Sequence, residues 1–213
     1  MTPPLALAAA LLALFAADLP GRLRVRASFV VAPCVEAAAR AWPGPRAAVQ
    51  VETAGPSTPG PADVLVASSV ELTRALEGGT AAEGTDVDVA RVPWVMQVRS
   101  GGATIRGAAD LATSGVEVTV PDSPAAYEAR RWAAAAGGGR VREASGRELR
   151  EAAVAVIPLS LAGTGERIAV DVPSIVVRAA LALQPERPAD ARAFVAFLAS
   201  EPGQKAFAEC RTR

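Results

Sequence analysis

Apolar residues along this chain gather in short runs, separated by stretches rich in proline, glycine and charged side chains. Some runs are compact, as in buried strands, and others repeat an apolar residue every three or four positions, as in one face of a helix. The compact runs predict strands over residues 23–31, 47–53, 63–67, 92–99, 116–120, 152–157 and 168–172. The helical spacing predicts helices over residues 33–42, 68–78, 105–112, 123–137, 190–199 and 201–209. Strands that alternate with helices indicate an α/β fold with a mostly parallel sheet.

Local signals mark several of these boundaries. Pro33 suits the first turn of a helix, where its missing N–H is not needed. Ser68 and Glu71 have the spacing of a capping box, in which each residue satisfies a free N–H of the other at a helix start. The stretch 55–61, GPSTPGP, predicts a loop without regular structure.

The N-terminal segment resembles a targeting signal more than a fold element. Residues 5–17 are thirteen consecutive apolar residues, a length that suits the hydrophobic part of a secretory signal and is short for a membrane span. A buried N-terminal helix and an uncleaved anchor remain alternatives. Export would place Cys34 and Cys210 in an oxidising compartment, where an even number of cysteines permits a disulfide.

The absence of histidine narrows the possible functions more than the overall composition does. The 213 residues carry 22 basic and 22 acidic side chains, and this balance argues against binding to nucleic acid or to an anionic membrane. Without histidine, Ser-His-Asp and Cys-His catalysis and histidine-based metal sites are excluded. Two cysteines cannot hold a zinc or iron–sulfur cluster, and the only lysine, Lys205, does not end a phosphate loop. We therefore expect no cofactor and no enzymatic activity.

Four segments together carry a family pattern. Residues 23–42 read as an opening strand, turn and helix, and residues 61–68, PADVLVAS, as a buried strand. Residues 105–121 contain an Asp-Leu-Ala turn before a Gly-Val strand, and residues 191–207 read ARAFVAFLASEPGQKAF. These segments resemble the type 2 periplasmic solute-binding proteins of ABC importers, especially the molybdate-binding branch, and the last of them is the most specific.

The resemblance implies a two-lobe α/β fold, the type 2 periplasmic-binding-protein fold, with hinge strands crossing between the lobes. Residues 1–17 would be the signal peptide or N-terminal anchor. Lobe I would contain residues 22–90 and 172–213, and lobe II residues 91–171. The crossing segments would be residues 92–99 and 168–176.

The resemblance further places Cys34 and Cys210 on the same lobe, which favours a disulfide between them over two separate thiols. It implies a monomer in the periplasm or outside the cell that passes a small oxyanion, molybdate or tungstate first, to an ABC permease in the membrane.

The resemblance also implies a ligand site between the lobes. Hydroxyl groups and main-chain N–H groups at helix starts would hold the anion, because a helix N-terminus supplies unpaired donors and the positive end of its dipole. Strand–helix junctions gather at one edge of an α/β sheet, so donors from different junctions can meet there. The aligned position of the family's first serine is Val30, with Ser28 as the nearest hydroxyl, and that of its tyrosine is Pro158, with Ser160 close by. The ligand residues implied are therefore Ser28, Ser57, Thr58, Ser123, Ala125 through its N–H, and Ser160.

Several of these residues also have ordinary structural interpretations. Ser68 is expected to cap its helix, and Ser123 to cap its helix or contact the anion. Ser57 and Thr58 would serve equally as turn residues in a loop of proline and glycine. The arginines between residues 130 and 150 alternate with glutamates, which predicts a solvated face.

Two other functions remain open alongside transport. The chain shows no general base beside a serine, aspartate or glutamate nucleophile, so catalysis on this scaffold lacks support. A solute-binding fold that has lost its ligand and acts as a sensing or interaction module is the stronger alternative. Its evidence is two shortened helices, at residues 55–61 and after residues 145–147, together with Pro158, where the family has a tyrosine.

Overall fold

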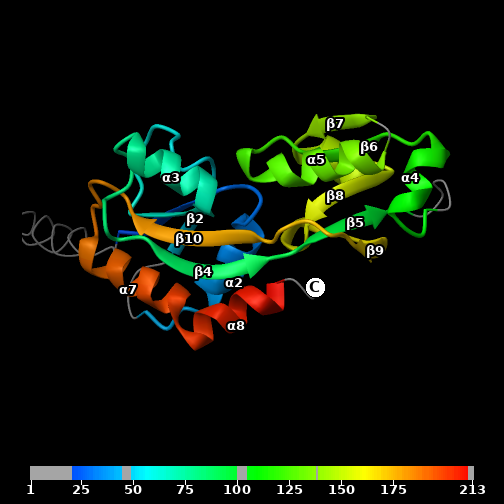
Figure 1. Ribbon diagram of the computed structural model, residues 1–213. Helices are drawn as coiled ribbons and strands as arrows, with labels where there is room; N and C mark the ends of the chain where they lie inside the picture. Colours follow the sequence, from blue (N-terminus) through cyan, green and yellow to red (C-terminus); the bar gives the residue numbers. More distant parts are fainter. Residues whose placement is uncertain (1–20, 45–48, 100–104, 138, 211–213) are drawn as a thin grey trace, which may run out of the picture.

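The computed structural model describes residues 21–44, 49–99, 105–137 and 139–210. Two five-stranded sheets lie side by side along the long axis of the molecule, each with its own helices (Figure 1). The first sheet has the order β2-β1-β3-β10-β4 and the second the order β7-β6-β8-β5-β9. The predicted α/β class is therefore confirmed. The segment expected to be an export signal, residues 5–17, lies outside the described residues.

The strands of the first sheet are β1 (Leu23–Ala27), β2 (Val49–Thr53), β3 (Val64–Ser68), β4 (Val87–Val92) and β10 (Ile175–Leu181). Those of the second sheet are β5 (Trp94–Val98), β6 (Val118–Pro121), β7 (Val141–Ala144), β8 (Val154–Pro158) and β9 (Glu166–Ala169). The helices are α2 (Ala32–Ala41), α3 (Ser69–Glu77), α4 (Ala108–Ser114), α5 (Tyr127–Ala136), α6 (Gly146–Glu151), α7 (Pro188–Ala199) and α8 (Glu201–Cys210). Two single turns of 3₁₀ helix, η1 (Pro124–Ala126) and η2 (Leu159–Leu161), follow β6 and β8.

Both sheets are mixed, so the prediction of a mostly parallel sheet is wrong. Strands β1, β2 and β3 pair in parallel, as do β6, β7 and β8. Among the described strands, every antiparallel pair contains β5 or β10. These two strands enter their sheets directly from the other sheet rather than through a strand–helix–strand crossover, which is the connection that a parallel neighbour needs.

The chain passes between the sheets twice. Only Pro93 separates β4 in the first sheet from β5 in the second. The return runs from β9, which ends at Ala169, to β10, which begins at Ile175, and both passages lie near the middle of the molecule in Figure 1. The residues of the second sheet are therefore inserted between β4 and β10, which pair with each other in the first sheet.

The first predicted strand is shorter than expected. The sequence predicted a strand over residues 23–31, but β1 ends at Ala27. The N–H of Ser28 donates to the carbonyl of Val66, and the Ser28 carbonyl accepts from the N–H groups of Val31 and Ala32. This turn redirects the apolar residues that follow into the start of α2, where they are buried.

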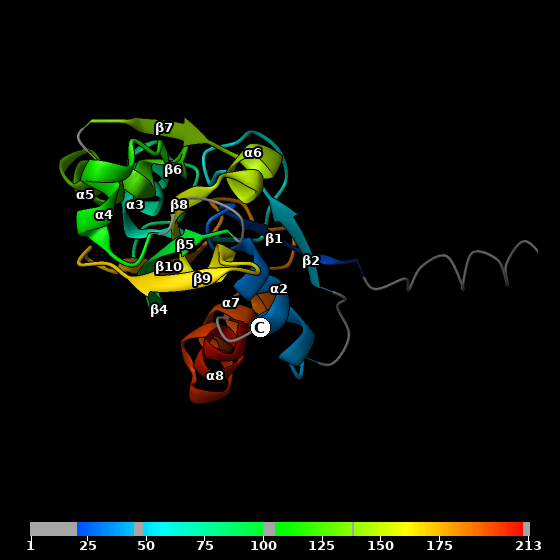
Figure 2. The ribbon, with the colours of Figure 1, turned by 90° about the vertical axis from the view of Figure 1, so that its right-hand side faces the viewer.

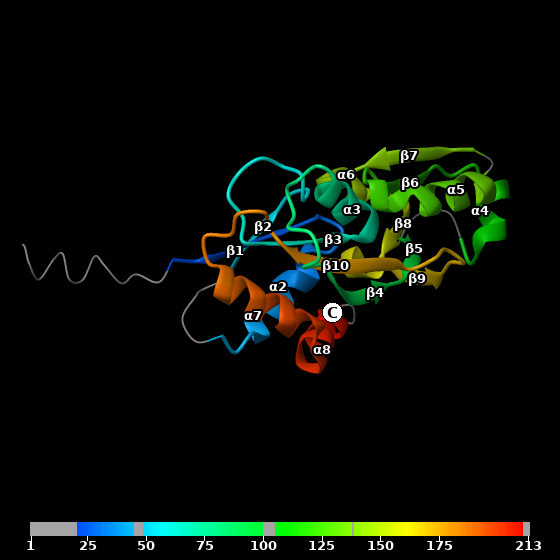
Figure 3. The same ribbon diagram turned by 60° about the vertical axis from the view of Figure 1, so that its left-hand side comes forward.

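The main core of the first sheet lies under α2, α7 and α8, and α3 covers part of the opposite face (Figure 3). Phe194 and Phe207 are fully buried, and the Phe194 ring meets Trp42 edge to face with ring centres 5.3 Å apart. A disulfide joins Cys34 to Cys210, with 5.1 Å between the Cα atoms, which confirms the expected pairing. No helix in the described part of the chain is long and apolar enough to cross a membrane.

Candidate binding site

The carboxyl ends of the parallel strands in the two sheets face one another. Two hydrogen bonds cross this boundary: the Ser160 hydroxyl donates to the Val30 carbonyl, and the Ser123 hydroxyl lies 3.3 Å from Oε1 of Glu71. We call this region, where the turn 28–31 and the start of α3 meet η1 and η2, the junction. It is the place where a ligand held by both sheets would lie.

Among the site residues of the sequence analysis, Ser28 is the one whose side-chain hydroxyl is buried without a hydrogen-bond partner in the described structure. The residue is 1% exposed, and its Oγ accepts and donates no hydrogen bond within the described residues. A buried hydroxyl left unpaired costs about 1–3 kcal/mol. A ligand oxygen at the start of α2 would remove that cost.

Ser123 and Ala125 lie together at the start of η1. The N–H of Ala125 donates to the Ser123 Oγ at 3.2 Å, so in this structure the expected anion donor is already used by the cap. The Ser123 hydroxyl is buried and donates onward to Glu71. Ser123 therefore caps its helix, as one interpretation expected, and lies at the junction; contact with an anion stays a prediction.

Glu71 is a carboxylate at the junction that the sequence analysis assigned only to a helix cap. The capping box is present: the Ser68 hydroxyl lies 2.7 Å from Oε2 of Glu71, and the Glu71 N–H donates to the Ser68 Oγ at 3.3 Å. An acid thus adjoins two serines, contrary to the expectation of no neighbouring base. Because Ser68 is buried and accepts the helix N–H, this pair is structural rather than nucleophilic.

Ser160 supplies the second hydroxyl group that forms a hydrogen bond across the junction. It lies in η2, directly after β8, and is 7% exposed. Its hydroxyl donates to the carbonyl of Val30, two residues before the first residue of α2. The expected ligand residues Ser28, Ser123, Ala125 and Ser160 therefore gather at the junction, but three of them are bonded to protein groups.

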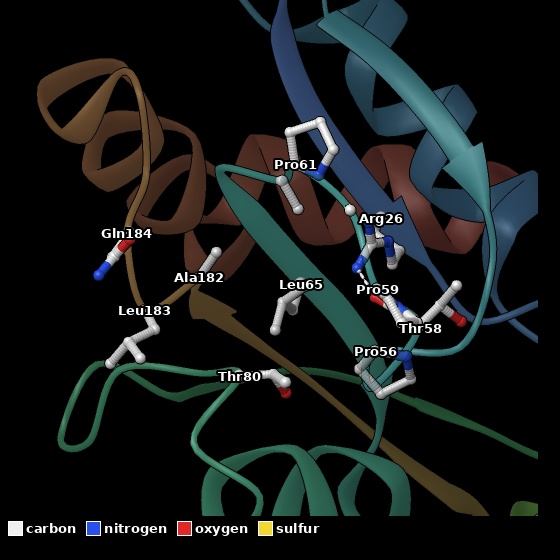
Figure 4. A pocket seen from close by; sticks show the side chains of 12 residues that line it. Arg26, Pro56, Thr58, Pro59, Pro61, Leu65, Thr80, Ala182, Leu183 and Gln184 are labelled. Atoms are coloured by element: carbon white, nitrogen blue, oxygen red, sulfur yellow. Dashed lines mark hydrogen bonds between the residues drawn. The ribbon is translucent and has the colours of Figure 1, made fainter.

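Ser57 and Thr58 are placed differently. Both are exposed in the loop between β2 and β3, and no described hydrogen bond or pocket joins them to the other four residues. The Thr58 carbonyl accepts a hydrogen bond from the buried Arg26 guanidinium, as Figure 4 shows. Thr58 lines a cavity of about 380 Å³ over the first sheet, with Leu65 at its base and Leu183 on the opposite wall (Figure 4).

Comparison with known proteins identifies the family. The family described as bacterial extracellular solute-binding protein matches residues 9–160, more than two thirds of the chain. The chain belongs to this family. Its members are, by that description, binding proteins that act outside the cytoplasm. No curated protein sequence matches this solute-binding protein.

Solved structures share the fold at low sequence identity. The periplasmic molybdate-binding protein of Azotobacter vinelandii superposes with a TM-score of 0.71 and 14% identity, covering 89% of this chain and 97% of that one. The sulfate-binding protein SubI of Mycobacterium tuberculosis gives 0.69 and 20%, covering 89% and 85%. A periplasmic thiamin-binding protein gives 0.65 and 14%, covering 88% and 80%. Because their ligands differ, these relatives establish the two-lobe fold and not the ligand.

Proposed function

We propose that this solute-binding protein is the extracytoplasmic receptor of an ABC-type importer and binds a small oxyanion, molybdate or tungstate first, at the junction. The observation that carries the proposal is the buried, unpartnered hydroxyl of Ser28 at the start of α2. The family supports a receptor outside the cytoplasm, and two proteins of this fold are named for molybdate and sulfate.

The proposed binding requires the hydrogen-bond donors at the junction to leave their present protein acceptors and bind the anion instead. Ser123 and Ser160 now donate to protein oxygens, and the N–H of Ala125 donates to Ser123. An anion entering between the sheets would replace Glu71, the Val30 carbonyl and the Ser123 Oγ as the acceptors for these three donors. Neutral hydroxyl and N–H donors suffice for an oxyanion, because they need no fixed positive charge when they converge.

This exchange needs the two lobes to move apart, and they could do so by rotating about the two connections between the sheets. Lobe I would comprise residues 22–90 and 172–213, and lobe II residues 91–171. Pro93 and the segment between β9 and β10 would act as the hinge. Separation of the lobes would break only two described side-chain hydrogen bonds, those of Ser123 and Ser160.

The test is a thermal-shift titration of the protein with molybdate, tungstate, sulfate and phosphate. An anion at about 100 times its dissociation constant stabilises the folded state by about 2.7 kcal/mol. For a chain of this size, Tm should rise by about 5–10 °C. Ser28→Ala should remove most of the shift, whereas Ser69→Ala, on the neighbouring helix start, should retain it.

A second candidate function is a sensing or interaction module that binds no oxyanion. The specific observation in its favour is that the Ser123 and Ser160 hydroxyls already have protein partners, with the Glu71 carboxylate beside one of them. If none of the four oxyanions shifts Tm at about millimolar concentration, this alternative replaces the receptor.

A further inference from the structure

A second cavity lies on one face of the second sheet, beside α6, and shares one lining residue, Ser160, with the proposed oxyanion site. Its volume is about 310 Å³, within the range of small-molecule sites. The lining residues come from β5, α6, β8, the segment between β8 and β9 and, through Pro33, the start of α2. Figure 2 shows β5, β8 and α6 in the half of the molecule that faces the viewer. The residues that matter for its chemistry are Gln97, Arg99, Leu149, Arg150, Ile157 and Leu161.

The shortness of α6 explains why the cavity exists. This helix has six residues and buries Leu149 against Val95 and Ile157, which fills only part of the sheet face. Farther along β5, Gln97 points to the same face, and the chain continues to Arg99 at the end of the strand. The uncovered part of the face is therefore lined by polar and cationic side chains above an apolar floor.

Two arginines line the cavity without a carboxylate partner. Neither Arg99 nor Arg150 forms an ion pair within the described residues, and the Arg99 Nε is buried with no hydrogen-bond partner there. The acids of α6 are already paired, Glu148 with Arg142 at 3.4 Å and Glu151 with Arg147 at 2.7 Å. The positive charges of Arg99 and Arg150 are therefore not neutralised by a neighbouring carboxylate among the described residues.

Gln97 fixes the wall opposite α6. Its Nε2 donates to the Thr164 carbonyl at 2.9 Å, and its Oε1 accepts from the Gly163 N–H at 2.9 Å. Because both ends of this amide are used, the segment between β8 and β9 is held in place before any ligand enters. The lining residues include no aspartate or glutamate.

We propose that this cavity binds a small organic carboxylate. The two guanidinium groups would pair with the carboxylate, since arginine presents several N–H donors in the planar arrangement that a carboxylate accepts. Leu149, Ile157 and Leu161 would cover a short apolar body, which an inorganic oxyanion lacks. The cavity shares Ser160 with the junction, but Ser28, Ser123 and Ala125 do not line it, so the two proposals can be tested separately.

Calorimetric titration of the full chain with benzoate tests this proposal, with benzyl alcohol as the uncharged analogue and sulfate as the anion without an apolar body. Benzoate should bind, and both controls should bind at least about tenfold more weakly, because a hydrogen bond to a charged group contributes about 1.5–3 kcal/mol. Arg99→Gln and Arg150→Gln should each weaken benzoate by about tenfold or more.

Arg147→Gln is the matched control, because Arg147 lies on the same helix, pairs with Glu151 and does not line the cavity. It should change benzoate affinity by less than about twofold. Arg150 is exposed, so its substitution should leave the fold intact. Ser28→Ala should leave benzoate binding unchanged, which separates this site from the junction. Equal weakening by Arg147→Gln, equal binding of benzyl alcohol, or no benzoate binding at about 10 mM would each overturn the proposal.

Discussion

At the scale of single residues, Asp63 shows what the PADV segment does physically. Asp63 is 2% exposed and lies just before β3. Its Oδ2 accepts from the Arg24 N–H at 2.8 Å, and its Oδ1 accepts from the Arg187 N–H at 2.9 Å. One carboxylate thus joins the start of β3 to two segments that are distant from it in sequence, the start of β1 and the N-cap of α7.

Asp63→Ala should therefore destabilise the protein strongly. The substitution leaves two largely buried backbone donors without an acceptor, at about 1–3 kcal/mol each. We expect the free energy of unfolding, measured with urea, to fall by about 2–4 kcal/mol. Asp122→Ala is the control, since Asp122 is exposed with no described side-chain hydrogen bond, and it should stay within about 0.5 kcal/mol. Equal losses in the two variants would refute this role for Asp63.

The site residues show how far a sequence can be interpreted at this scale. The family resemblance implied Ser28, Ser123 and Ser160 as ligand residues, and each follows a strand end in the structure, although Ser28 fell within the strand predicted over residues 23–31. Their partners could not be predicted. The hydroxyl of Ser160 meets the carbonyl of Val30, 130 positions away, and no local pattern encodes that approach. For the same reason Glu71 was recognised as a cap but not as a residue of the junction.

At the scale of elements, the corner between α7 and α8 depends on one glycine. The Ser200 hydroxyl and N–H both donate to the Phe197 carbonyl, at 2.6 and 3.0 Å, and close the end of α7. A Cβ on Gly203 would lie 2.0 Å from that same carbonyl oxygen. The glycine of the EPGQ sequence is therefore required by packing between the helices.

Gly203→Ala should lower stability by about 1–3 kcal/mol or more, because the added methyl group meets backbone that cannot move without disturbing both helices. For a chain of this size, we expect Tm to fall by at least about 3 °C. Gly107→Ala is the control, because an added Cβ there has no heavy atom within 4 Å and φ is −170°. A Gly203→Ala variant as stable as the control would contradict the packing argument.

Elements with a strong apolar period were predictable, and strands that contain charged residues were not. The stripe in residues 190–199 and the capping box of α3 agree with the structure. Strands β4, β7 and β10 were missed. In β10 the apolar run is interrupted by Arg178, which is held by Asp86 and, at 3.2 Å, by Asp88. Such a strand is stabilised by cross-strand pairs, which only the assembled sheet provides.

At the scale of the whole molecule, the fold class followed from the alternation of strands and helices, whereas the sheet pairing did not. The hydrophobic pattern of β5 and β10 is the same whether their neighbours run parallel or antiparallel. Direction was decided by the passage of the chain between sheets, through Pro93 and before Ile175. Local sequence carries little information about such a passage, because it contains few residues and no regular period.

The disulfide also acts on the whole molecule, because it joins the start of α2 to the end of the final helix. Cys34 and Cys210 are 176 positions apart, so the bond restricts nearly the entire unfolded chain. A chain-entropy estimate for a loop of this length gives about 5 kcal/mol. The pairing also fixes α8 against α2 beside the turn that holds Ser28.

We therefore expect the double variant Cys34→Ala, Cys210→Ala to lose about 3–5 kcal/mol in free energy of unfolding, with a lower Tm. The loss arises because the unfolded chain regains the conformational freedom that the bond removes. Urea unfolding with and without dithiothreitol supplies the control. Reductant should lower the stability of the natural sequence to that of the variant and should leave the variant unchanged. If reductant left the natural sequence as stable as before under conditions that reduce the bond, the disulfide would not be a stabilising element.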